Sequence, residues 1–389
     1  MTLARLSGIP DLVLFLALGV LTGPFVLGWV QLSASGGLGE LIVTGGAVFM
    51  LYEGGRAIDL SILRRIWPSV TLLATVGVAL TSGVVALATH LFIGATWPVA
   101  LLAGAAIAST DPATIVPLFM QVKVKRRIQQ LVVSESAFND ATAAVLTIAF
   151  LALAQGQATG GAAIAGTFGR LILVGVVAGL VVGLVVQYLV AEFGRTPLWT
   201  RMEQNGVATL FAMAAAYATA QVLGGSGFMA VFLAGIVRGS GGRWGLRPRA
   251  EHEAKHEDFL AILGTAVRIL IFGVLGANVD LPLLGRMGMA GLAVTAALLF
   301  IGRPVTVFAC LLPDRLAKFH LKEMLFVSWV RETGVVPAAL GTILLAERAP
   351  GAETVAALIF LAIMVTIVVQ APTTRPWARR LGVSEEDGA

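Results

Sequence analysis

The stretch from Gly104 to Ile148 decides the fold, and it runs GAAIASTDPATIVPLFMQVKVKRRIQQLVVSESAFNDATAAVLTI. Two apolar segments flank one basic loop, and each segment carries acid near its middle. The first segment contains Asp111 followed by Pro112, and the second contains Glu135 and Asp140. An ionisable residue at bilayer depth is costly and marks a functional site by default. We therefore expect the two segments to face each other across such a site.

The first segment carries two helix-breaking residues. Pro112 has no backbone N–H and disfavours helical geometry at Asp111, so we expect the helix to break where this carboxylate lies. Pro117 weakens the same segment a second time. Inside a membrane, irregular backbone is tolerated only where protein or a water-filled cavity satisfies its polar groups.

The second segment places its polar residues on one side of a helix. Glu135 and Asn139 are four residues apart, as are Ser136 and Asp140, so all four are expected near one face. A broken helix that faces an acid-bearing helix predicts a desolvating cation site at the bilayer midplane.

The expected ligands of that site are hard oxygen atoms. The carboxylates of Asp111 and Asp140 and the hydroxyls of Thr110 and Ser136 offer the oxygen that Na⁺ prefers. Ligand type is shared between Na⁺ and K⁺, so these residues do not decide between the two ions.

The composition is that of a polytopic helical membrane protein. The chain has 389 residues, of which 57% are hydrophobic and 13% charged, whereas a soluble domain has about 25% charged residues. Apolar runs of about 20 residues recur along the whole length. The net charge of +5 is explained by loop placement, so no nucleic-acid partner is expected. The single cysteine excludes an intramolecular disulfide.

About twelve transmembrane spans are predicted. They are residues 11–30, 38–55, 67–93, 97–120, 129–154, 168–191, 204–221, 226–239, 259–277, 287–312, 323–346 and 352–373. Span eleven carries Arg331, Glu332 and Pro337 around its centre, as span four carries Asp111 and Pro112. Interrupted spans at corresponding places in two halves predict an inverted-repeat transporter with its site between them.

The loops predict the orientation. Nearly all basic loop residues fall on one side, and the other side holds only Arg170, Arg286 and Arg348. The positive-inside rule then puts both termini in the cytoplasm of a plasma-membrane (inner-membrane) protein. Asp59 is predicted to be the N-cap of a short interfacial helix over Leu60–Trp67.

At these residues the sequence resembles the monovalent cation/proton antiporters, on the NhaP and eukaryotic sodium/proton exchanger branch. The matching motifs are LYEGGRAIDL at Leu51–Leu60, STDPA at Ser109–Ala113, SESAFNDA at Ser134–Ala141, GGSGFMAVFLAGIV at Gly224–Val237, FGVLGANVDL at Phe272–Leu281 and VQAPTTRPWARRL from Val369. The resemblance implies crossing broken helices in spans four and eleven, a core that moves against a dimerisation domain, and a homodimer. It gives residues 1–373 as one transmembrane antiporter domain with these parts interleaved, and 374–389 as a short cytoplasmic tail.

The resemblance also implies roles for the site residues. Asp140 is similar to the family's ion-binding and proton-exchanging aspartate, with Asn139 before it. Asn-Asp in place of Asp-Asp resembles the electroneutral branch. Thr110, Asp111 and Ser136 match positions that help to coordinate the cation.

Three further charged residues are expected beside the site. Glu135 and Arg331 match the family's buried ion pair. Glu332 stands where the family has glycine after the core arginine, and this extra acid is a candidate modulator of ion choice.

The chemistry of a buried carboxylate predicts exchange. Asp140 can hold a proton or help to hold a cation, but not both well, so alternating access to one site couples the two fluxes. With one titrating carboxylate, one proton moves per monovalent ion. The expected substrates are H⁺ and Na⁺ or Li⁺, with a potassium/proton antiporter as the alternative, and no cofactor is expected.

Two other classes of protein place acid in a membrane. A cation channel would use Asp111 to line its pore and would conduct without moving protons in the opposite direction. An intramembrane aspartyl protease would need a Gly-x-Gly-Asp motif on its second helix, and this sequence has none. We therefore predict a transporter and not an enzyme.

Overall fold

The computed structural model describes residues 11–29, 37–110, 119, 124–157, 161–193, 196, 206–241, 250–314 and 317–383. The predicted break at Asp111 and Pro112 lies outside these residues, as do Pro117 and the last six residues of the predicted tail.

The described chain is helical and contains no β-strand, which confirms the predicted fold class. The elements are α2 (Asp11–Thr22), α3 (Gly37–Arg56), α4 (Leu60–Leu72), η1 (Leu73–Gly77), α5 (Val78–Ile93), α6 (Trp97–Ile107), α8 (Arg126–Ala154), α9 (Gly161–Phe193), α11 (Val207–Val222), α12 (Gly227–Ser240), α13 (Ala250–Ala277), α14 (Leu281–Ala297), η3 (Leu298–Gly302), α15 (Arg303–Leu311), α16 (Leu321–Trp329), α17 (Val335–Ala346), α18 (Ala352–Val365), η4 (Thr366–Gln370) and α19 (Ala371–Leu381).

Length and composition identify the membrane-crossing elements. Within the described residues, six helical segments are long and apolar enough to cross a bilayer unaided. Shorter apolar helices, among them α6 and α17, lie next to the predicted breaks in spans four and eleven. Span eleven is interrupted as predicted: α16 ends at Trp329 and α17 begins at Val335.

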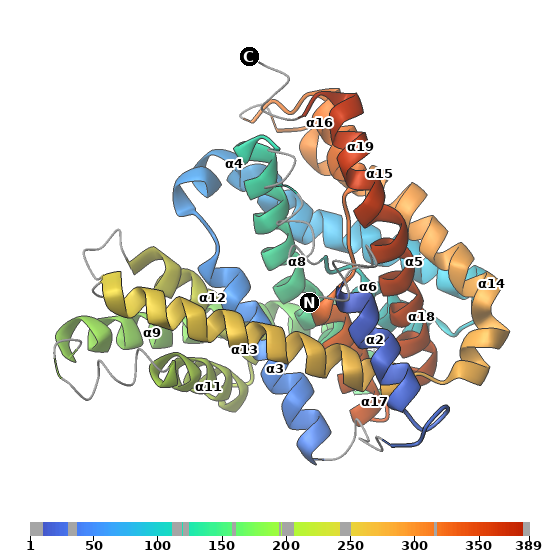
Figure 1. The fold of residues 1–389 in the computed structure, drawn as a ribbon, viewed down its shortest axis with the longest axis horizontal. Coiled ribbons are helices and arrows are strands. Elements are labelled where there is room, and N and C mark those ends of the chain that lie inside the picture. Colours follow the sequence, from blue (N-terminus) through green and yellow to red (C-terminus); the bar gives the residue numbers. More distant parts are fainter. Residues whose placement is uncertain are drawn as a thin grey trace.

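Helix α8 lies near the centre of the molecule, with α9, α11 and α12 on one side and α5, α14 and α18 on the other (Figure 1). On the first side α12 packs against α3 and α9, while α13 packs against α2, α3 and α17 and so joins the two groups. On the other side, α5 packs against α6 and α14, while α18 packs against α14 and α17. Helix α8 contacts α6 as well as α3 and α9, so the acid-bearing helix lies where the two groups meet.

Glycine permits the closest of these helix contacts. A Cβ atom on Gly104 of α6 would lie 2.2 Å from the carbonyl oxygen of Ser82 on α5. A Cβ atom on Gly235 of α12 would lie 2.3 Å from the carbonyl oxygen of Tyr52 on α3. Close backbone approach through small residues is how helices associate in lipid, where no hydrophobic force drives them together.

Asp59 is an N-cap as predicted, because its side chain accepts a hydrogen bond from the backbone N–H of Ser61 at 2.8 Å. The separate interfacial helix over Leu60–Trp67 is wrong. The helix runs on through Pro68 to Ile93, interrupted only by the π-helical turn η1. Pro68 removes a single backbone hydrogen bond near the exposed start of the helix, which does not end it.

The π-helical turn η1 packs against α15, the helix that begins directly after a second π-helical turn, η3. Thr306 donates a hydrogen bond to the carbonyl oxygen of Gly77 at 3.3 Å, and its hydroxyl lies 2.9 Å from that of Thr81. Side-chain hydroxyls thus satisfy backbone that the π-helical turn leaves irregular, and such turns are frequent at functional sites.

Candidate functional site

Helix α8 carries the central residues of the site. Glu135, Ser136 and Asn139 are each at most 3% exposed, and Asp140 is half-buried. Their spacing of four residues on a continuous helix places them near one face, as the sequence indicated.

The end of α6 meets this face through two hydrogen bonds. Ser109 donates its hydroxyl to Oδ1 of Asp140, and Ser136 donates its hydroxyl to the backbone carbonyl of Thr110. Both Ser109 and Thr110 are buried. The structure therefore brings Asp140, Ser136 and Thr110 together, whereas Asp111 lies outside the described residues.

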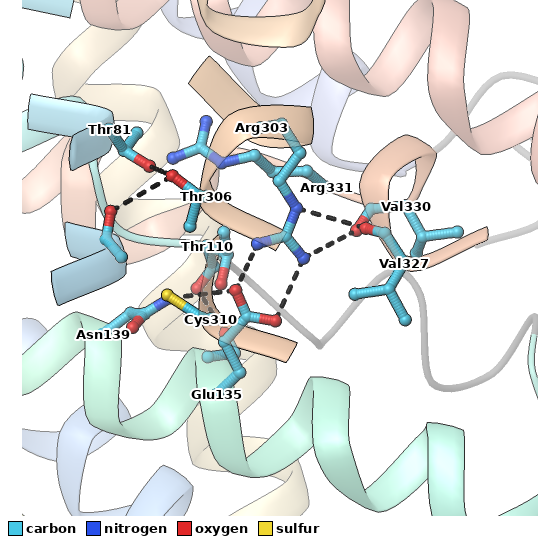
Figure 2. A network of polar contacts seen from close by, with 12 residues as sticks. Thr81, Thr110, Glu135, Asn139, Arg303, Thr306, Cys310, Val327, Val330 and Arg331 are labelled. Atoms are coloured by element: carbon cyan, nitrogen blue, oxygen red, sulfur yellow. Dashed lines mark hydrogen bonds and ion pairs between the residues drawn. The ribbon is translucent and has the colours of Figure 1, made fainter. Parts of the chain in front are cut away.

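Glu135 forms a buried ion pair with Arg303 of α15 (Figure 2). The Nη2 atom of Arg303 lies 3.0 Å from Oε2 of Glu135, and Nη1 contacts Oε1. The two side chains are 3% and 1% exposed. A two-pronged guanidinium–carboxylate contact of this kind fixes the orientation of both groups.

The same guanidinium also closes the end of α16. Nε of Arg303 donates to the carbonyl oxygen of Val327 at 3.2 Å, and Nη2 reaches that of Val330 at 3.5 Å. Figure 2 shows Arg303 between Glu135 and these two carbonyl groups. The C-terminal end of a helix carries partial negative charge, so a buried cation there is stabilising.

Arg331 closes the other broken span. Its Nη2 atom donates to the carbonyl oxygens of Ile107 and Ala108 at 2.8 and 3.0 Å, and lies 3.4 Å from that of Ser109. These carbonyls belong to the C-terminal end of α6, the first half of span four. Arg331 itself lies in the break between α16 and α17, so one side chain joins the two interrupted spans.

The predicted ion pair between Glu135 and Arg331 is therefore wrong in its cation. Glu135 pairs with Arg303, and Arg331 donates to backbone carbonyls. The physical reason is that each arginine lies opposite a different helix end, and only the one on α15 also reaches the Glu135 carboxylate. Arg303 and Arg331 both lie beside the site, and their side chains are 2% and 1% exposed.

Glu332 and Thr333 lie in the same break and are almost fully buried. The backbone N–H of Thr333 donates to the hydroxyl of Thr366 at 3.2 Å. Gln370 donates to the carbonyl oxygen of Trp329, the last residue of α16, at 2.5 Å. The π-helical turn η4, which contains Thr366 and Gln370, thus supports the interrupted backbone of span eleven from the side.

Asn139 connects the ion pair to η1. In one orientation its amide nitrogen lies 3.3 Å from Oε1 of Glu135. In the other orientation it lies 3.3 Å from the backbone carbonyls of Glu135 and Leu73. Asparagine cannot titrate, so this position beside Glu135 and Asp140 supplies dipoles and no exchangeable proton.

The site offers oxygen atoms of several kinds. The Asp140 carboxylate, the Ser109 and Ser136 hydroxyls and the Thr110 carbonyl lie where α6 meets α8. Such oxygens bind hard cations, and a carboxylate must lose its proton to do so.

Sequence reasoning missed two residues of the site. Arg303 carried a signal, because a lone arginine in an apolar span needs a buried partner, but the sequence does not say which acid it reaches. Ser109 precedes Thr110 in the chain, and only the packing of α6 on α8 selects its hydroxyl for Asp140.

A family model described as sodium/hydrogen exchanger, transmembrane, matches residues 1–380. The chain belongs to this family. Among its relatives, the K(+)/H(+) antiporter NhaP of Alkalimonas amylolytica is 30% identical over 389 residues, with 98% of this chain and 64% of the relative covered. The low-affinity Na(+)/H(+) antiporter NhaS1 of Synechocystis sp. is 28% identical over 339 residues, with 84% and 62% covered.

A solved structure has the same fold. The sodium proton antiporter MjNhaP1 from Methanocaldococcus jannaschii, at pH 8, superposes with a TM-score of 0.83 and 25% sequence identity, covering 100% of this chain and 95% of that one. The antiporter fold that the family resemblance implied is confirmed. The chain spans less than two thirds of the length of the curated relatives named above.

We predict that Glu135 and Arg303 are energetically coupled. Glu135→Gln or Arg303→Gln alone strands a buried charge, which costs about 3–5 kcal/mol, and the double variant should lose less than the sum. Thermal unfolding of the three variants in detergent measures the coupling. The matched control is the cycle of Glu135→Gln with Arg331→Gln, which should show a smaller coupling. A larger coupling to Arg331 would contradict the assignment of Arg303.

Proposed function

We propose that this chain exchanges a monovalent cation for H⁺ across the membrane by alternating access to a site at Asp140. The observation that carries the proposal is the contact of Asp140 with Ser109, one residue before Thr110, beside a Glu135 that is held by Arg303. Because Glu135 is bound to an arginine, we assign the exchangeable proton to Asp140. The family and the named relatives support the proposed exchange, since each relative is named as a cation/proton antiporter.

The cycle follows from competition at one carboxylate. With its proton lost, Asp140 attracts a cation together with the oxygens of Thr110, Ser136 and Asp111. Protonation of Asp140 removes that charge and releases the ion. Because proton and cation exclude each other, movement of the site between the two sides of the membrane exchanges one for the other.

The identity of the ion is part of the proposal. We propose Na⁺ or Li⁺ as the cation, with K⁺ as the alternative. The relatives support both, because NhaP of Alkalimonas is named for K⁺ and NhaS1 of Synechocystis for Na⁺. Glu332, buried in the break of span eleven, is the residue we propose as a modulator of this choice.

The setting in the cell is also proposed. Charge asymmetry of the loops supports a plasma-membrane protein with both termini in the cytoplasm. Residues 1–373 would form the transporter, with core and dimerisation parts interleaved, and 374–389 a short tail that begins within α19. We propose a homodimer, as the resemblance to the exchanger family implies.

Asp140→Asn should abolish exchange while leaving folded protein in the membrane, because asparagine neither titrates nor carries charge. The measurement is proton flux in everted vesicles on addition of Na⁺, Li⁺ or K⁺. Asp258→Asn on α13 is the matched control, an exposed aspartate outside the site, and it should keep the wild-type flux. Cation-driven proton movement in Asp140→Asn would contradict the assignment of the exchangeable proton to Asp140.

Exchange should be electroneutral, with one proton per ion. Asn139 cannot titrate and Glu135 is neutralised by Arg303, so Asp140 alone exchanges its proton, provided that Asp111 stays ionised throughout. A membrane potential should therefore not drive transport in proteoliposomes without a pH gradient. A potassium–valinomycin potential tests this for Na⁺ and Li⁺, and another ionophore pair is needed for K⁺. If the potential alone accumulates ion, Glu332 is the first residue to suspect of carrying a second proton.

A further inference from the structure

A groove lies between α16 and α19, away from the ion site. The two helices pack beside each other (Figure 1). The groove is a cavity of about 340 Å³ lined by Trp329, Thr373, Pro376, Trp377 and Arg380. These side chains supply aromatic and aliphatic walls, with one guanidinium among them.

The aromatic wall continues beyond the groove. The ring centroids of Trp329 and Trp377 are 6.3 Å apart, and those of Phe300 and Trp329 are 6.2 Å apart. Phe300 lies in η3 and is 63% exposed. The indole N–H of Trp329 already donates to Thr373 at 2.9 Å, so the rings offer apolar faces to whatever covers them. Tryptophan is enriched where a membrane protein meets the lipid interface, so lipid is the expected cover of this partly exposed row.

The other end of the groove is basic. Helix α19 carries Arg375, Arg379 and Arg380 and no acidic residue. Arg380 is exposed and forms no ion pair with any residue that the structure describes. Tryptophan followed by arginine towards a helix end is typical of the membrane–water interface, where arginine meets lipid phosphate.

We propose that this groove binds an anionic phospholipid of the leaflet into which α19 extends. One acyl chain would lie along Phe300, Trp329 and Trp377, and the phosphate would pair with Arg380. The guanidinium presents paired N–H groups that match phosphate oxygens, and the absence of acid on α19 leaves the groove complementary to negative charge. The loop charges make this the cytoplasmic leaflet.

The test uses tryptophan fluorescence in phosphatidylcholine vesicles that contain a small fraction of brominated phosphatidylglycerol, or the same fraction of brominated phosphatidylcholine. Bromine quenches tryptophan at contact, so the wild type should be quenched more strongly by the anionic lipid. Trp329→Phe should remove much of this difference and so locate it in the groove. The readout needs no transport, so the proposal stands or fails separately from the proposed exchange.

Arg380→Gln should reduce the preference for the anionic lipid by about fivefold, the effect of one basic residue at an anionic surface. The matched control is Arg375→Gln, an exposed arginine on the same helix that does not line the groove, and it should keep most of the preference. The proposal is overturned if Arg380→Gln behaves as the wild type or if both variants lose the preference equally. Reversal of the quenching by inorganic phosphate would also overturn it, since the ligand would then be a free anion.

Discussion

The structure depends on how carbonyl groups are satisfied where two membrane helices are interrupted. The last carbonyls of α6 and α16 lie inside the protein, where bulk water cannot reach them to donate hydrogen bonds. Arg331 donates to the first set, and Arg303, with Gln370, donates to the second. Each arginine thus allows a helix to end in the protein interior.

This constraint also sets the charge of the site. Two buried guanidinium groups bring two positive charges into a region of low dielectric, and Glu135 balances one of them through its pair with Arg303. The Glu135 carboxylate therefore stabilises the buried Arg303. Asp140, five residues further along α8, contacts a serine hydroxyl instead. The two acids of α8 therefore have different surroundings, because their partners come from different elements.

Hydropathy and local sequence signals were enough to predict the helical spans and the interruption of span eleven. Apolar runs predicted the helical spans, and the Arg331–Glu332 pair with Pro337 predicted the interruption between α16 and α17. Asp59 was predicted as an N-cap because the cap is a local hydrogen bond. The continuation of the helix through Pro68 was not predicted, because proline near the start of a long membrane helix does not by itself end the helix.

The partners of buried charges could not be predicted in the same way. Arg303 and Arg331 are both arginines in apolar spans, and only the packing of α15 against η1 and α16 directs the first of them to Glu135. The π-helical turns η1 and η3 were not predicted from the sequence. The helical spans follow from hydropathy and the polar face of α8 from residue spacing, whereas the pairing between helices is a property of tertiary structure.

The central claim is that a proton and a cation compete for Asp140. The most direct measurement is proton release from detergent-solubilised protein in weakly buffered solution on addition of Na⁺, Li⁺ or K⁺, followed with a pH indicator. Binding of the transported ion should release about one proton per chain, because a carboxylate must be deprotonated to hold a cation, and Asp140→Asn should release none. Cation binding, detected as thermal stabilisation, without release of protons from the wild type would contradict the account.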